Sequence, residues 1–312
     1  MRSSDIVIGR VLAAVAALSI AGSGSAAAPS PQALLARYSP VVVLHPAERF
    51  QPVPVDGFLA DSDVQARQPD GTWAAVPGPL PAAGGPWRLD QRHCLVRDGL
   101  AAVDCYASAE AAHGARPTVY GAYHRRGDRI ALQYWLFYPL NPYSPEVPPD
   151  PLFAQVHEGD WELVTVILDR AGRPLTAGYS RHCGGTRRAW AKVPKRGQRP
   201  LVYVALGSHA NYFRPGSFAH DKRCWPEQAV IVFENYGKPL RDFAGSGANL
   251  SPRVVRVTAA SPAWMRFPGA WGEDQIVFFP QATFTFGAGP TGPAFKRVRK
   301  VPVGVPLSWP WG

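Results

Sequence analysis

From about residue 118 onward, short apolar or β-branched runs alternate with turns rich in glycine and proline. Such runs predict strands, and the first four form two hairpins because only short segments around Gly127 and Gly172 separate their members. The predicted strands are 118–124, 129–138, 161–169, 175–180, 201–206, 229–234, 254–258 and 275–279. Several runs are apolar throughout, which indicates strands covered on both faces.

The fold class follows from the many strands and the scarcity of long helical segments. Short strands with turns between them are typical of a β-sandwich or barrel and not of βαβ units. The 30 glycines and 33 prolines among 312 residues leave little room for a helical bundle. We predict an all-β, mainly antiparallel β-sandwich with long loops and minor helix, including a helix at 31–38 and mostly turns from 45 to 85. Residues 28–312 are expected to form one domain.

The N-terminus has the pattern of a secretory signal peptide. A charged start is followed by the apolar run 11–21 and by small residues at 25–27. The apolar run is about half of the roughly 20 residues that span a bilayer. We expect residues 1–27 to be removed by cleavage near Ala27, which makes the mature chain an extracellular or periplasmic protein with a basic net charge.

Export makes two disulfides the expected state of the four cysteines, since none of their spacings is C-x-x-C. We favour Cys94 with Cys105, which would staple a local hairpin. Cys183 with Cys224 would close a longer loop and remove more entropy from the unfolded chain. The spacing by itself permits three pairings.

The densest chemical motif is His-Glu-Gly-Asp-Trp-Glu at 157–162, at the start of a predicted strand. Because side chains alternate along a strand, Asp160 and Glu162 share one face while Trp161 points to the other. Two carboxylates on one face repel each other unless a divalent cation, an arginine or a shared proton lies between them.

His157 is close enough to join such a site, because Gly159 frees the backbone to turn the imidazole back toward the carboxylates. Oxygen-rich ligands with at most one histidine favour calcium or magnesium, and manganese or zinc also fit. Two alternatives stay open. The carboxylates could form salt bridges at a strand end, or one of them could act as a general acid beside its ionised neighbour.

Two further polar clusters follow apolar strands, one with Ser180 and His182 and one with Ser208 and His209. In a sandwich, strand ends gather at the rim, where a rigid scaffold holds binding residues. The expected ligand-binding residues are Ser180, His182, Ser208, His209 and Trp161.

Catalysis is the competing interpretation. A triad of Ser208, His209 and Asp160 can be written, but the G-x-S-x-G elbow is missing, and adjacent residues on a strand face opposite ways. A metal-assisted hydrolase of a phosphodiester, ester or glycan would use a cation-activated water, with His182 or His209 transferring the proton. We favour a binding protein over an enzyme.

Basic residues gather at 187–199 and at 296–300, ahead of Trp309 and Trp311. Most such runs are solvated loops, but in an exported protein they also attract anionic lipid headgroups or acidic polysaccharide. No recognition motif for nucleic acid accompanies the charge, and the sequence implies no obligate protein partner.

Five blocks in order, between about 130 and 295, resemble the vacuolar protein sorting-associated protein 62 family, which includes the plant domain of unknown function 946. The blocks are 134–141, 157–162, 179–185, 202–210, and 269–272 with 289–293, and the segment 44–48 is a fainter match.

The central blocks are also similar to the necrosis- and ethylene-inducing (Nep1-like) secreted cytolysins. That resemblance implies a sandwich like those of actinoporins, and a divalent cation that engages sphingolipid headgroups on a target membrane. His157, Asp160 and Glu162 match the family pattern, Asn141 falls where the family has an aspartate, and Gly159 replaces a second histidine.

These observations lead to one hypothesis. The protein is a secreted binding protein that holds a divalent cation through Asp160 and Glu162, assisted by His157 and Asn141. It would bind a membrane lipid headgroup or a cell-surface glycan, with cytolysis implied only by the resemblance to the cytolysins.

Overall fold

The computed structural model describes residues 29–114, 116–146, 154–225, 227–279 and 282–296. The predicted signal peptide at 1–27 lies outside the described residues, as do Trp309 and Trp311.

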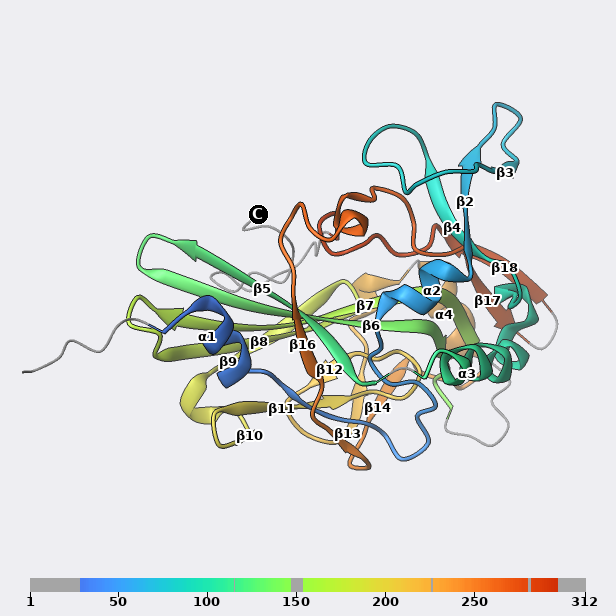
Figure 1. Ribbon diagram of the computed structural model, residues 1–312. Coiled ribbons are helices and arrows are strands. Elements are labelled where there is room, and N and C mark those ends of the chain that lie inside the picture. The colour runs from blue at the N-terminus through green and yellow to red at the C-terminus, as the bar shows by residue number, and fades with distance from the viewer. Residues whose placement is uncertain (1–28, 115, 147–153, 226, 280–281, 297–312) are drawn as a thin grey trace, which may run out of the picture.

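A sheet of eight strands runs through the middle of the molecule (Figure 1). Strands neighbour one another in the order β16-β5-β6-β7-β17-β18, and β8 and β9 branch from β7. All neighbours are antiparallel except β16 and β5, which are parallel. The strands are β5 (Thr118–Arg126), β6 (Arg129–Tyr143), β7 (Ala154–Asp169), β8 (Pro174–Arg181), β9 (Gly184–Ala189), β16 (Arg253–Arg256), β17 (Gln275–Phe279) and β18 (Ala282–Gly287). Both predicted hairpins are present, as β5–β6 and β7–β8.

A second sheet of five short strands packs against one face of the central sheet. Its strands are β1 (Val41–Val43), β10 (Lys195–Arg196), β11 (Arg199–Val204), β12 (Asn211–Tyr212) and β15 (Asn249–Leu250). Val42 and Val202 from this sheet share one buried cluster with Tyr134, Leu136 and Val164 from the central sheet. This arrangement of two packed, mainly antiparallel sheets is the predicted all-β sandwich, and β1 beside β11 is a second parallel pair.

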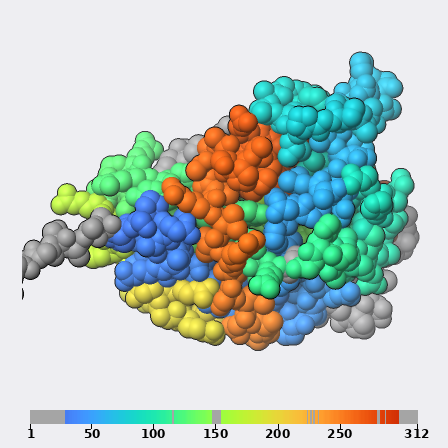
Figure 2. All heavy atoms as spheres, in the orientation of Figure 1, coloured from blue at the N-terminus to red at the C-terminus, as the bar shows by residue number. Residues whose placement is uncertain are grey.

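The other face of the central sheet carries an aromatic cluster. Trp135, Phe137 and Trp161 from β6 and β7 are fully buried against Trp271, and Trp264 completes the cluster. The segment that follows β16, drawn in orange, lies across this side of the molecule (Figure 2). Because both faces of β6 and β7 are covered, both strands are buried almost throughout, although β7 carries the polar block at 157–162.

Smaller elements surround the sandwich. The three-stranded sheet of β2 (Ser62–Arg67), β3 (Trp73–Ala75) and β4 (Trp87–Gln91) lies where turns were predicted. Its strands are mostly half-buried, so the alternation of apolar and polar residues that signals a strand is weak. A two-stranded sheet joins β13 (Gly216–Ala219) to β14 (Arg241–Ala244).

The helices are short. The predicted N-terminal helix is present as α1 (Pro31–Arg37), and α2 (Val55–Ala60) and α3 (Ala102–Ala112) were not predicted. The strand predicted at 229–234 is wrong, since these residues lie in helix α4 (Glu227–Asn235). Val230 and Phe233, three positions apart, are buried while Ile231 is 49% exposed, which is a helical pattern that a short apolar run does not reveal by itself.

Both predicted disulfides are confirmed, Cys94–Cys105 and Cys183–Cys224. The prediction that the first one staples a hairpin is wrong, because Cys105 lies in α3 and a short 3₁₀ helix precedes it. Two disulfides fit an oxidising compartment. Within the described ranges, no helix is long and apolar enough to cross a membrane.

Candidate functional site

The 157–162 block lies inside a strand and not at the start of one, because β7 begins at Ala154. Asp160 and Glu162 point toward the second sheet, where they meet His209 and Asn211. Trp161 points to the opposite side and packs into the aromatic cluster. The predicted separation of the carboxylates from the tryptophan is therefore confirmed.

Gly159 is required by both its conformation and its surroundings. Its φ is +59°, and a Cβ at this position would lie 1.8 Å from the carbonyl oxygen of Trp271. The neighbouring His157 is buried, and its Nδ1 lies 2.9 Å from the carbonyl oxygen of Glu158. Burial lowers the pKa of His157 below its ordinary value, although the nearby Asp160 opposes this.

His209 supplies a positive charge between two buried carboxylates. Its Nδ1 lies 3.0 Å from Oδ2 of Asp160, and its Nε2 lies 3.6 Å from Oε1 of Glu48. Burial lowers the pKa of His209, but the charge of Glu48 and the hydrogen bond to Asp160 outweigh it and raise the pKa to about 9. Burial would raise the pKa of Asp160, but the hydrogen bond with His209 and the charges of His157 and His209 outweigh it and lower that pKa to about 2. Tyr138 stacks on the imidazole at 3.8 Å.

Glu162 has weaker interactions to offset the cost of burying its charge. It accepts a hydrogen bond from the Ser180 hydroxyl, and Nδ2 of Asn211 lies 3.5 Å away. Burial raises its pKa to about 7, opposed chiefly by the positive charge of Lys296. The charge of Lys296 also lowers the pKa of Asp160. The two carboxylates therefore differ, since Asp160 is ionised and Glu162 titrates near neutrality.

Two buried oxygen atoms beside these carboxylates lack a hydrogen-bond partner among the described residues, the Tyr138 hydroxyl and Oδ1 of Asn211. Asn141, the predicted amide ligand, presents its nitrogen to Asp160 at 3.3 Å. Its oxygen instead accepts a hydrogen bond from the backbone N–H of Tyr143. The spare amide oxygen in this cluster is thus that of Asn211. We call Glu48, Tyr138, Asn141, His157, Asp160, Glu162, Ser180, His209 and Asn211 the polar cluster.

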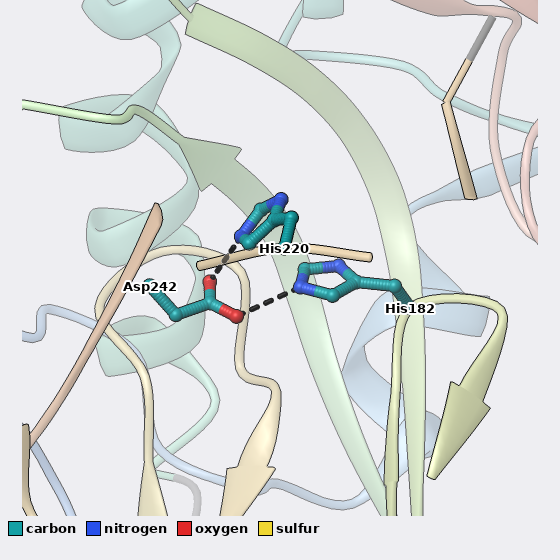
Figure 3. Close-up of side chains that lie close together, drawn as sticks. All are labelled: His182, His220 and Asp242. Carbon is teal, nitrogen blue, oxygen red and sulfur yellow. Dashed lines mark hydrogen bonds and ion pairs between the residues drawn. The ribbon is translucent and has the colours of Figure 1, made fainter. Parts of the chain in front are cut away.

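A second group adjoins the polar cluster through Ser208, whose carbonyl oxygen accepts a hydrogen bond from Asn141 and whose hydroxyl donates to Asp242. Figure 3 shows the three members of this group. The group consists of His182, which follows β8, His220, which follows β13, and Asp242 on β14. Among the described His, Cys, Asp and Glu residues, these form the one set of three whose ligand atoms all lie within 4.8 Å of one another. Asp242 is fully buried, and it accepts hydrogen bonds from the Ser208 hydroxyl at 2.5 Å and the Tyr212 hydroxyl at 2.6 Å.

The hypothetical catalytic triad does not assemble. The Ser208 hydroxyl donates to Asp242, whereas both nitrogens of His209 face Asp160 and Glu48. His182 and His209 do share one unusual property, because they are the non-glycine residues with positive φ in the described chain, at 49° and 52°. Such conformations gather at functional sites.

The tertiary structure thus brings the predicted site residues together with one exception, Trp161, which faces the aromatic cluster. Sequence reasoning missed Glu48, Asn211, His220 and Asp242, and it named Lys296 only as part of the basic run at 296–300. Glu48 had a local signal, since the Leu-His-Pro-x-Glu segment at 44–48 belongs to the family resemblance. His220 and Asp242 had none, because their only link to the site is through space.

Comparisons with known proteins support the predicted resemblance. No family model matches the chain. Two curated yeast (Saccharomyces cerevisiae) proteins are similar in sequence. Vacuolar protein sorting-associated protein TDA6 is 27% identical over 56% of this chain, and vacuolar protein sorting-associated protein 62 is 25% identical over 59%. The match covers 44% of each relative, so the chain spans less than half of their length.

Solved structures of Nep1-like proteins match as well. One is NLPPya in complex with glucosamine, with 17% identity, a TM-score of 0.33, and coverage of 73% of this chain and 75% of that chain. Another is Necrosis and Ethylene inducing Protein 2 from the causal agent of cocoa's Witches Broom disease, with 12% identity, a TM-score of 0.33, and coverage of 73% and 74%. The chain is therefore similar in sequence to the vacuolar protein sorting-associated group that its motifs indicated.

Proposed function

We propose that the protein is a secreted binding protein that holds a hard divalent cation beside Asp160 and Glu162 and uses it to bind a lipid or glycan headgroup. The observation that carries the proposal is the excess of buried oxygens in the polar cluster. Two carboxylates lie beside the Tyr138 hydroxyl and the Asn211 amide oxygen, neither of which has a hydrogen-bond partner among the described residues. Each buried polar atom left unpaired costs about 1–3 kcal/mol.

The donor set suits calcium or magnesium, which prefer carboxylate, amide and hydroxyl oxygens. Asp160, Glu162 and Asn211 would hold the ion, which would supply a positive charge to an anionic or hydroxyl oxygen of the headgroup. His209 keeps Asp160 ionised at neutral pH, and Asn141 orients it by facing its Oδ2. Lys296 lies within electrostatic reach of both carboxylates, so it would add attraction for an anionic headgroup.

The first test of this proposal is the thermal unfolding midpoint of the mature protein, measured with chelator and then with calcium, magnesium or manganese. An ion that binds only the folded state stabilises it, so the midpoint should rise with one of these ions. Glu162→Gln should abolish the rise. Glu110→Gln is the matched control, because Glu110 is also a largely buried glutamate with a pKa raised to about 7 by burial. An equal rise in parent and Glu162→Gln would contradict the proposal.

The second test measures binding. Vesicles of phosphatidylcholine, with and without a glycosylated sphingolipid, are mixed with the protein and separated by flotation. We expect cation-dependent recovery of the parent and of Glu110→Gln with the glycolipid vesicles, and loss of recovery with Glu162→Gln. Equal recovery with chelator present would show that binding does not use a cation.

A further inference from the structure

The group of His182, His220 and Asp242 lies outside the polar cluster, and the proposed function does not use it. Nε2 of His182 lies 2.7 Å from Oδ2 of Asp242, and Nε2 of His220 lies 3.0 Å from Oδ1. Figure 3 shows the aspartate between the two imidazoles, with one carboxylate oxygen directed at each. The ring centroids of the histidines are 3.9 Å apart.

His220 is the residue that a purely structural network leaves unexplained. Its side chain is fully buried, yet neither ring nitrogen makes a hydrogen bond within the described part of the chain. Its Nε2 makes an ion-pair contact with Asp242 at 3.0 Å but lacks the geometry of a hydrogen bond. A buried imidazole whose ring nitrogens have no hydrogen-bond partner among the described residues is costly unless something binds it.

Asp242 and His182, by contrast, are satisfied without a ligand. Asp242 accepts hydrogen bonds from Ser208 and Tyr212 and pairs with His182. A structural role accounts for these two residues and fails to account for His220.

The distances suit a metal ion. In a tetrahedral zinc site with bonds of about 2.0–2.1 Å, neighbouring ligand atoms are about 3.3 Å apart. The two nitrogen–oxygen distances of 2.7 and 3.0 Å are a few tenths of an ångström shorter. A small outward movement of the side chains would admit the ion. Two imidazoles and one carboxylate form a donor set that suits zinc, unlike the all-oxygen set beside Glu162.

A cavity supplies access and room for a fourth ligand. It has a volume of about 170 Å³ and is lined by His182 and His220 together with Arg181, Gly184 and Tyr212. Three protein ligands with an open position toward a cavity are the arrangement of a zinc site that binds water or a further ligand.

Two features of the fold hold the ligands in place. The Cys183–Cys224 disulfide joins the residue after His182 to the segment that follows His220. The antiparallel pairing of β13 with β14 sets Phe218 opposite Asp242 and Ala219 opposite Arg241, so His220 lies one residue beyond the paired end of β13, diagonally across from Asp242. The three side chains are therefore brought together before any ion binds.

We propose that His182, His220 and Asp242 form a zinc site whose fourth position opens to the adjacent cavity. This site is separate from the hard-cation site of the proposed function and does not depend on it.

The test uses the full mature chain stripped with a chelator and titrated with cobalt(II), which reports tetrahedral coordination by its visible absorption, and then with zinc. We expect one equivalent of cobalt to give that absorption and zinc to displace it. Zinc at about a hundredfold excess over its dissociation constant should raise the unfolding midpoint by about 5 °C.

His220→Gln and His182→Gln should each weaken zinc binding by more than about tenfold. His182 is partly exposed, so its variant keeps the proposal testable if His220→Gln fails to fold. The matched control is His113→Gln, since His113 also faces an aspartate, Asp61, at 2.8 Å but has no second histidine. Glu162→Gln should bind zinc normally. Absence of the cobalt absorption, or unchanged zinc affinity in His182→Gln, would overturn the proposal.

Discussion

The two faces of β7 differ in chemistry, because one packs aromatic rings and the other pairs buried charged groups. On one side, Trp161 contacts Phe137 at 4.9 Å and Trp271 at 5.1 Å between ring centroids. On the other side, Asp160 meets the imidazole of His209. Ring contacts tolerate a range of angles, as the interplanar angles of 54° and 89° show. Hydrogen bonds between buried charged groups tolerate much less variation in geometry.

The two faces contribute differently to the stability of the fold. The aromatic face stabilises the fold through buried area, which adds up without strict geometry. The polar face gains little net stability, because removing charges from water offsets their attraction. Its retention in the centre of the sandwich therefore points to function.

The largest expected effect comes from the aromatic face. Trp161→Ala should destabilise the protein by about 3–5 kcal/mol, because it leaves a large cavity among fully buried rings. Urea denaturation followed by circular dichroism measures the loss. Trp161→Phe, which keeps most of the packing, should lose clearly less. A loss for Trp161→Ala below about 1 kcal/mol would remove the distinction between the two faces.

The second prediction compares the effects of removing each of the two disulfides. Replacing Cys183 and Cys224 by serine should cost about 4 kcal/mol, and replacing Cys94 and Cys105 about 3 kcal/mol, because the loops close 41 and 11 residues. Only the first pair of substitutions should also weaken zinc binding, since only that disulfide adjoins His182. Equal zinc affinity in the two double variants would mean that the disulfide does not position the histidines.

The third prediction concerns Glu110, a carboxylate placed beside the aromatic cluster. It lines a cavity of about 400 Å³ with Val53 and Phe58, and its Oε2 has no hydrogen-bond partner among the described residues. Burial raises its pKa from 4.5 to about 7. A raised pKa contributes stability below the unfolded value of 4.5, and this contribution is lost as the pH rises through about 7.

Glu110→Gln should therefore match the parent near pH 4 and be more stable by about 3 kcal/mol near pH 9. Urea denaturation at both pH values measures the difference. The same difference at the two pH values would show that the carboxyl group does not titrate between them.

The smallest effect is expected on the polar face. Glu162→Gln, measured with chelator at pH 7, should change stability by less than about 1 kcal/mol. The pKa of Glu162 is about 7, so the side chain is already neutral in part, and an amide oxygen still accepts the hydrogen bond from Ser180. A loss above about 2 kcal/mol would mean that this face, too, is retained chiefly for stability.

Local patterns predicted the parts of the fold that depend on neighbours in the chain. The hairpins β5–β6 and β7–β8 follow from turns at Gly127 and Gly172 between apolar runs. The failure at α4 has a physical cause, since a run of five apolar residues at 229–233 fits a helix and a strand equally. Its one-sided burial exists only because Val230 and Phe233 pack against the rest of the protein.

Alternation along a strand is a property of the backbone, so the sequence was enough to place Asp160 and Glu162 on one face. It also favoured the two disulfide pairs that the structure contains, although spacing alone permits three pairings. What faces those carboxylates depends on tertiary packing. Glu48 and His209 lie far apart in sequence, and so do His182 and Asp242, yet they meet because the strands and loops that carry them pack together. The protonation state of a buried ionisable group depends on the groups that surround it, and the packing of the sheets decides which groups those are.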